Sequence, residues 1–327
     1  MNFLKKIFFI CIVLNLTSLN AKPVPGSFAD LAEKLMPSVV NISTTQTVKT
    51  TTNNFPFQFP PGSPFGEMFK DFERPMERKA SALGSGFIIE ENGTVITNNH
   101  VIKGAENILV KIGTKEYKAK VIGADPYMDV AVLKMDTKDK FQPVEFGDSD
   151  KARVGDWVVA IGNPFGLGGT VTSGIVSARN RDIGMTRYDD FIQTDASINR
   201  GNSGGALIDT NGRLIGINTL IRSSTGGSEG IGLAIPSTSA LEIVSDLIQY
   251  GEVRRGWLGF SIDRQSLLLK GQIVIDQVAK NGPAAKGGLL KNDILISIDN
   301  NKASYENLYK TFARSKPGDD IFLEIER

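Results

Sequence analysis

Short apolar runs, separated by glycines and turn-forming residues, make up most of the chain between residues 83 and 235. Their spacing is typical of many short strands, which indicates an all-β sandwich or barrel. The runs behind this prediction are residues 86–89, 94–97, 107–112, 129–135, 156–161 and 214–217. We therefore predict a mainly β domain over this part of the chain.

Apolar residues change to a helical spacing after residue 236. On a helix over residues 237–250, one side is formed by Leu241, Val244, Leu247 and Ile248. Gly251 is placed to end this helix, and we put a domain boundary there. A smaller α+β unit is predicted to follow, with strands at residues 258–262, 273–275, 294–298 and 321–325 and a helix at 305–314.

Residues 44–79 interrupt the β pattern with a Thr/Asn-rich stretch and then a Phe/Pro-rich stretch. The prolines remove backbone donors and exclude a helix interior, so no regular element is expected at residues 55–65. Two interpretations stay open. The segment is either a disordered loop or a functional flap whose phenylalanines contact a partner surface.

The first 21 residues have the order of a secretory signal peptide. Lys5 and Lys6 precede an apolar stretch at residues 7–16, and a short segment ending at Ala21 follows. The apolar stretch is shorter than the ~20 residues that span a bilayer. We expect export and cleavage after Ala21, with an uncleaved anchor as the alternative because bulky Leu19 lies near the cut.

Composition narrows the classes of function. Lys and Arg (37) balance Asp and Glu (36), which gives no indication of a nucleic-acid partner. Cys11, the only cysteine, lies in the segment expected to be removed, and the chain has a single histidine. A thiolate or zinc site is hard to build from these residues, so we expect no metal and no cofactor. Export without cysteines suits a bacterial periplasm.

Ser203 lies in the glycine-rich run at residues 201–205, Gly-Asn-Ser-Gly-Gly. A serine between glycines can simply form a tight turn. It can also be a nucleophile, because glycines let backbone N–H groups converge on one point, as acyl transfer requires.

A nucleophilic serine needs a base, and His100 is the only histidine in the chain. A lone histidine is often an incidental residue, so a carboxylate partner must support it. Asp125 precedes a proline and is a typical turn residue, whereas Asp129 opens an apolar strand. Burying Asp129 unpaired would be costly, and a hydrogen bond from the histidine removes that cost. The chain order His, Asp, Ser is that of chymotrypsin and indicates a serine endopeptidase.

The segments around these residues resemble the HtrA/Deg family of periplasmic serine proteases, and the resemblance covers the chain from Phe28 onward. It is carried by residues 84–87 (Gly-Ser-Gly-Phe), 97–101 (Thr-Asn-Asn-His-Val), 129–134, 162–166, 193–205 and 230–236. The resemblance implies a chymotrypsin-like double β-barrel over residues 22–250 and an α+β PDZ domain over residues 251–327. It also implies that His100 is the general base, Asp129 its orienter and Ser203 the nucleophile. The backbone N–H groups of Gly201 and Ser203 would form the oxyanion hole.

The same resemblance assigns two binding regions. Ile198, Leu220 and Ile221 would line the primary substrate pocket, where no acid is placed to hold a basic side chain. We therefore predict a preference for Val, Ala or Ile before the scissile bond. The run Trp257, Leu258, Gly259 and Phe260 resembles the carboxylate-binding loop with which PDZ domains capture a peptide C-terminus, although an ordinary strand opening is the alternative.

Regulation and assembly are implied by the resemblance as well. Arg181 matches the signalling arginine of the family's sensor loop at residues 179–188, and residues 222–229 match an activation loop; both could instead be ordinary solvated loops. The Phe-rich segment corresponds to a loop that in relatives reaches into a neighbouring subunit, so a homotrimer or a multiple of it is expected. The chain ends at Arg327, where family members continue, so we expect the PDZ domain to be incomplete at its C-terminus.

Two functions therefore compete. The first is an endopeptidase that degrades unfolded or misfolded exported polypeptides and binds peptide C-termini at its PDZ domain, without a membrane span after signal cleavage. The second is a chaperone or peptide-binding scaffold whose catalytic residues are idle. The intact set of His100, Asp129 and Ser203 favours the first.

Overall fold

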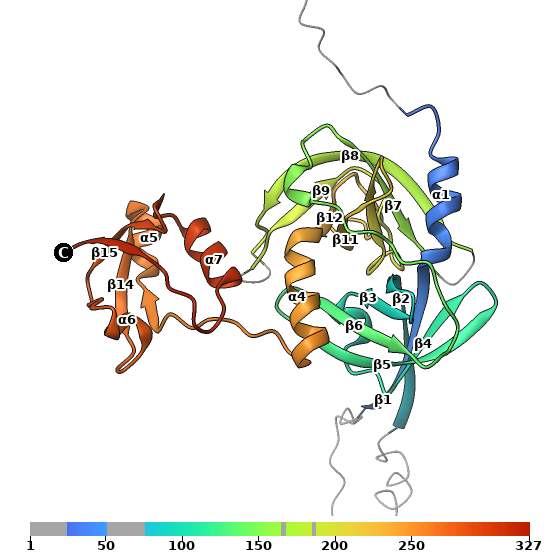
Figure 1. Cartoon of the computed structure of the whole chain (residues 1–327), viewed down its shortest axis with the longest axis horizontal. Coiled ribbons are helices and arrows are strands. Elements are labelled where there is room, and N and C mark those ends of the chain that lie inside the picture. Colours follow the sequence, from blue (N-terminus) through green and yellow to red (C-terminus); the bar gives the residue numbers. More distant parts are fainter. Residues whose placement is uncertain (1–24, 51–75, 165–167, 185–187) are drawn as a thin grey trace, which may run out of the picture.

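The computed structural model describes residues 25–50, 76–164, 168–184 and 188–327. Within these residues, two closed barrels of six strands each are followed by a smaller sheet with helices (Figure 1). The predicted double-barrel, mainly β fold is confirmed. The expected signal peptide and residues 51–75 of the Phe-rich segment lie outside the described residues.

The first barrel has the strand order β1-β2-β3-β6-β5-β4, and all its neighbours pair antiparallel. Its strands are β1 (Val39–Thr50), β2 (Met76–Glu90), β3 (Thr94–Thr97), β4 (Asn107–Ile112), β5 (Lys115–Asp125) and β6 (Val130–Met135). Its interior is filled by apolar side chains that include Ile42, Ile88 and Leu133. The short helix α3 (Asn99–Ile102) follows β3 and carries His100. In front of β1 lie α1 (Ala29–Leu35) and the 3-10 turn η1 (Met36–Ser38).

The second barrel repeats this architecture with the order β10-β11-β12-β9-β8-β7. Its strands are β7 (Trp157–Gly162), β8 (Thr170–Arg181), β9 (Phe191–Thr194), β10 (Ala206–Asp209), β11 (Leu214–Ile221) and β12 (Gly232–Pro236). The 3-10 turn η2 (Ser149–Lys151) lies in the connection between the barrels. The interior of the second barrel includes Val158, Ile192 and Leu207.

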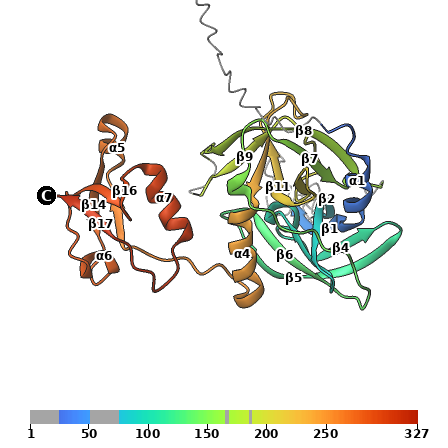
Figure 2. The ribbon, with the colours of Figure 1, turned by 45° about the horizontal axis from the view of Figure 1, so that its top comes forward.

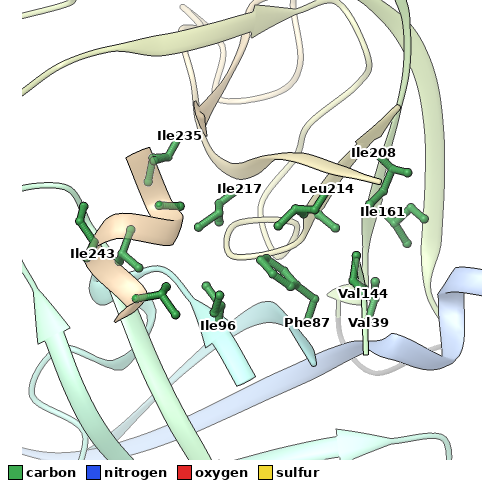
Figure 3. Packing of buried hydrophobic residues seen from close by; sticks show 14 of the residues in the cluster. Val39, Phe87, Ile96, Val144, Ile161, Ile208, Leu214, Ile217, Ile235 and Ile243 are labelled. Carbon is green, nitrogen blue, oxygen red and sulfur yellow. The ribbon is translucent and has the colours of Figure 1, made fainter. Parts of the chain in front are cut away.

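The largest buried cluster joins the two barrels (Figure 3). Phe87 and Ile96 of the first barrel meet Ile161 and Ile217 of the second, and Ile243 of helix α4 (Ser237–Tyr250) closes the cluster. Burial of this apolar surface fixes how the barrels are oriented, and with it the cleft between them.

Helix α4 packs on strands β5 and β6 of the first barrel and on β11 and β12 of the second. It ends at Gly251, whose φ of 77° is left-handed and whose N–H donates to Leu247 O, as the sequence predicts. The predicted apolar side was partly wrong, because Leu241 and Ile248 are exposed. The buried side is formed by Ala240, Ile243, Val244 and Leu247, since the position of the helix over both barrels decides which side is covered.

The C-terminal unit lies beside the barrels on the side of α4 (Figure 2). It contains β13 (Phe260–Ile262), α5 (Arg264–Lys270), β14 (Ile273–Val278), α6 (Pro283–Lys286), β15 (Ile294–Ile298), β16 (Asn301–Lys302), α7 (Tyr305–Arg314) and β17 (Leu323–Glu326). Ile275, Leu295 and Leu308 lie in its separate core. Strand β13 begins at Phe260 rather than at Leu258, because the preceding Gly259 has a left-handed φ of 78°. Among the described residues, no helix combines the length and the apolar character needed to cross a membrane.

Candidate active site

A cavity of about 590 Å³ lies in the cleft between the barrels. Its lining brings together His100, Asp129 and Ser203, which are far apart in the sequence. The three predicted pocket residues, Ile198, Leu220 and Ile221, line the same cavity. The structure therefore gathers these six predicted residues into one site.

His100 and Asp129 are joined by two hydrogen bonds. His100 Nδ1 lies 2.6 Å from Asp129 Oδ2, and the backbone N–H of His100 donates to Asp129 Oδ1 at 2.8 Å. Both carboxylate oxygens are thus occupied by one residue, which fixes the imidazole in position and leaves its Nε2 for chemistry.

The backbone around Asp129 explains how this carboxylate reaches the histidine. Asp129 directly precedes β6 and has a left-handed φ of 54°, a conformation that Asp tolerates better than most residues. Its carbonyl accepts from Asn98 Nδ2 at 2.9 Å and from the Asn99 N–H at 3.1 Å. The turn before β6 is therefore anchored to the residues that begin α3, which carries His100.

Asp125 has the turn role that the sequence predicts and a further one that it does not. Its carboxylate accepts from the N–H groups of Tyr127 and Met128, both at 3.2 Å. It is also paired with both terminal nitrogens of Arg255, although Asp125 is only 2% exposed. Arg255 lies over the rings of Tyr127 and Tyr188, at 5.3 and 4.8 Å from the ring centroids. Both tyrosines line the cavity.

The loop that carries Ser203 needs its glycines. Gly201 and Gly204 have left-handed φ values of 97° and 84°. A Cβ on Gly201 would lie 2.7 Å from Pro164 Cβ, and one on Gly204 would lie 2.1 Å from the Ser85 carbonyl oxygen. The loop is held by Asn202 N–H donating to Asn199 O and by Gly204 N–H donating to Asn218 O. Asn202 is buried beneath it, while half-buried Ser203 lines the cavity.

The pocket next to Ser203 is largely apolar, with fully buried Ile198 beside Leu220 and Ile235. Asp190 also lines the cavity, which the sequence did not lead us to expect. It stands just before β9, where neither spacing nor neighbouring residues marks it as a pocket residue.

The predicted regulatory residues lie around this site. Arg181 ends β8 and donates from Nε to Gln193 Oε1 on β9 at 3.0 Å, and it is not a lining residue of the cavity. In residues 222–229, hydrogen bonds from Thr225 and Ser224 lower the pKa of Glu229 to about 2. The Ser228 N–H donates to Asn199 Oδ1 at 3.0 Å, which connects this loop to the nucleophile loop.

The predicted carboxylate-binding loop leads into β13 of the C-terminal unit, and none of its four residues lines the cavity. Trp257 is 65% exposed. The carbonyls of Leu258 and Gly259 accept from Ala284 and Ala279, which fixes the loop in front of Phe260. In the part of the chain that the structure describes, no group of three or more His, Cys, Asp or Glu residues is arranged to hold a metal ion.

Several buried polar residues of the first barrel contact the site without having been assigned a role from the sequence. They are Asn41, Ser85, Thr97 and Asn98. Ser85, Thr97 and Asn98 lie in two of the segments that carry the family resemblance, residues 84–87 and 97–101, but that resemblance gave them no role.

Residues 84–217 match the sequence profile of the trypsin-like peptidase domain, and residues 256–327 match that of the PDZ domain. A curated relative from Brucella suis, named "Probable periplasmic serine endoprotease DegP-like", is 44% identical over an alignment that covers 93% of this chain and 67% of the relative. A protein of the same name from Rickettsia conorii is 43% identical and is aligned over 86% of this chain and 60% of its own length.

Solved structures agree with these sequence matches. The structure named "HtrA-type protease AlgW with decapeptide" has a TM-score of 0.74 at 41% identity, covering 92% of this chain and 94% of that chain. A serine endoprotease from Yersinia pestis has a TM-score of 0.65 at 34% identity, covering 93% and 94%. The similarity therefore extends over both barrels and the C-terminal unit.

Proposed function

Because this chain belongs to the HtrA/DegP family of serine endoproteases, we propose that Ser203, His100 and Asp129 form its catalytic triad. The observation that supports this most is the double hydrogen bond between His100 and Asp129, in a cavity that Ser203 also lines. The Asp129 carboxylate keeps the imidazole proton on Nδ1, so Nε2 is free to accept the proton of Ser203 Oγ.

In the proposed reaction, Ser203 Oγ attacks the carbonyl carbon of the scissile peptide bond while His100 Nε2 takes its proton. The tetrahedral intermediate collapses when His100 returns that proton to the leaving amine and the C–N bond breaks. Water, activated by His100, then hydrolyses the acyl-enzyme and releases the second fragment. The N–H groups of Gly201 and Ser203 stabilise the oxyanion in both steps, which the glycine-dependent shape of the loop supports.

A fluorophosphonate probe tests the nucleophile directly. We expect the folded protein to be labelled at Ser203, as located by mass spectrometry of the labelled peptide, because Oγ is activated only while His100 lies beside it. Prior unfolding in denaturant abolishes the labelling, and so does Ser203→Ala. Ser197→Ala, which removes an exposed serine from the same segment, is the matched control and keeps the labelling. Casein digestion that survives Ser203→Ala would refute the assignment.

The primary pocket is proposed to accept small or medium apolar side chains. Ile198, Leu220 and Ile221 supply its apolar surface, and this preference is expected as at least ~10-fold faster cleavage after Val, Ala or Ile than after Lys or Arg. Sequencing of the products from a peptide library measures it. Comparable cleavage after Lys or Arg, lost in Asp190→Asn, would instead show that the carboxylate of Asp190 selects basic residues.

The names of the relatives support a periplasmic setting. The protein is periplasmic, and we propose that its substrates are unfolded or misfolded exported polypeptides. We place the protease domain at residues 22–250 and the PDZ domain at residues 251–327, where the run Trp257 to Phe260 would bind peptide C-termini. We also propose a homotrimer or a multiple of it as the assembly, with Arg181 as a regulatory residue.

The alternative of a chaperone or scaffold without proteolysis has less support. The relatives and solved structures reported above are named as proteases, and none of them is named as a chaperone.

A further inference from the structure

Ser85 connects the first barrel to the nucleophile loop of the second. It lies on β2, is fully buried, and uses all its polar atoms in hydrogen bonds. Its N–H donates to Ser203 O at 2.8 Å, and its carbonyl accepts from Thr97 Oγ1 at 2.7 Å. Its hydroxyl accepts from the Asn163 N–H at 2.7 Å and donates to Gly201 O at 2.6 Å.

The direction of the hydroxyl bond is determined by its two partners. The Asn163 N–H can only donate and the Gly201 carbonyl can only accept. Ser85 Oγ therefore has one arrangement that satisfies both, with its hydrogen on Gly201 O. Ser85 is fully buried, so its hydroxyl has no access to bulk water if the bond to half-buried Gly201 is lost.

The peptide group between Gly201 and Asn202 is fixed at both ends as a result. Ser85 holds its carbonyl, and Asn199 O accepts its N–H at 3.0 Å. The two N–H groups proposed for the oxyanion hole, those of Gly201 and Ser203, lie on either side of this peptide. If the peptide rotated, they would no longer converge on one point, and glycine at 201 with a φ of 97° offers little resistance to such a rotation.

Ser85 itself is held in place by the first barrel. Its pairing partner on the neighbouring strand β1 is Asn41. Asn41 Nδ2 donates to Asn163 O at 2.9 Å and to Gly84 O at 3.3 Å. Asn163, which donates to Ser85 Oγ, is thereby fixed as well. A rigid strand of one barrel thus determines the orientation of a loop in the other.

We propose that Ser85 is a positioning residue that keeps the oxyanion-hole backbone in its catalytic conformation by holding the Gly201 carbonyl. The proposal rests on the function proposed above. It concerns the transition state, since Ser85 lies behind the loop and is not a lining residue of the substrate cavity. Its loss should affect the stabilisation of the oxyanion more than the binding of substrate.

Ser85→Ala is expected to lower kcat by about 10- to 100-fold while KM changes by less than about two-fold. The loss is smaller than the ~10²–10³-fold that follows deletion of an oxyanion donor, because both N–H groups are still present but are less often aligned. A peptide aldehyde, whose adduct with Ser203 places an oxygen anion in the hole, should bind more weakly by the same factor as kcat/KM falls. In a Ser203→Ala background, binding of an uncleaved substrate peptide should stay within about two-fold.

Ser237→Ala is the matched control. Ser237 is also a buried serine whose hydroxyl donates to a backbone carbonyl, that of Gly147, at 2.8 Å, and it does not line the cavity. The Ser237→Ala variant should lose about as much thermal stability as the Ser85→Ala variant, but its kcat should stay at the wild-type value. The pH profile of kcat/KM should be the same in all variants, because the hydrogen bonds of Ser85 do not involve the side chains of His100 or Asp129.

If Ser85→Ala does not fold, Ser85→Cys takes its place, since a thiol keeps the shape but is a weak donor. A kcat within about two-fold of the wild type in either folded variant would overturn the proposal, as would unchanged aldehyde binding. Failure of both variants to fold while Ser237→Ala folds would show a purely structural role and would overturn it too. Failure of the proposed function is a separate outcome: the wild-type protein would then neither react with the fluorophosphonate probe nor cleave substrate, whatever the variants do.

Discussion

Asp129→Asn is expected to lower kcat by about 10⁴-fold without unfolding the protein. The reason lies in the two hydrogen bonds from His100. The backbone N–H of His100 needs an acceptor where Oδ1 now lies, so the oxygen of the substituted amide would take that place and its NH₂ group would face Nδ1. An NH₂ group can donate only, which moves the imidazole proton to Nε2. His100 could then no longer accept the proton of Ser203.

The fold should tolerate this change because Asn adopts the left-handed φ of 54° as readily as Asp. Steady-state cleavage of a peptide substrate gives kcat, and circular dichroism checks the fold. Asp139→Asn is the matched control, since this carboxylate accepts from Tyr117 and Lys115 on the surface of the same barrel and should leave kcat within about two-fold. An Asp129→Asn enzyme that kept more than about a tenth of its kcat would contradict the proposed role of Asp129.

Local sequence pattern predicted the elements and the chemistry that depend on neighbours in the chain. Apolar runs and turn residues indicated β2, β3, β4 and β6 of the first barrel and β7 and β11 of the second. Residue type and chain order indicated His100, Asp129 and Ser203, because few side chains can perform acyl transfer and this chain has only one histidine. Gly251 ends its helix where the sequence placed it, since helix termination is a local property.

Properties that depend on distant partners could not be predicted in this way. Ser85 and Gly201 are 116 positions apart, and Asp125 and Arg255 are 130 apart. Nothing in the sequence near either residue shows that the other will lie beside it. The exposure of Leu241 has the same origin, because the buried side of α4 is decided by where the barrels meet. Asp190 likewise becomes a cavity residue only through the closure of the second barrel.

The pair of Asp125 and Arg255 is one such distant contact, and it connects the segment just before the PDZ match to the first barrel. Asp125 ends β5, four positions before Asp129 in the chain, and its carboxylate organises the turn between them. Arg255 comes just before the predicted carboxylate-binding loop and packs on Tyr127 and Tyr188 at the cavity. A change at Arg255 is therefore expected to affect the turn that precedes Asp129.

Arg255→Met is accordingly expected to destabilise the protein by about 3–5 kcal/mol, because it leaves the Asp125 carboxylate buried without its charge partner. Denaturant unfolding followed by tryptophan fluorescence measures the loss. Combining it with Asp125→Asn should recover part of the loss, because no buried charge is then left unpaired. The recovery is incomplete, since the Tyr127 and Met128 N–H groups bond to different carboxylate oxygens and the amide offers only one oxygen. Lys291→Met is the control: its partner is Asp276 at 3.3 Å, and both side chains are exposed, so its removal should cost less than about 1 kcal/mol. An Arg255→Met cost as small as that of Lys291→Met would show that Asp125 is solvated and that its contact with Arg255 opens in solution.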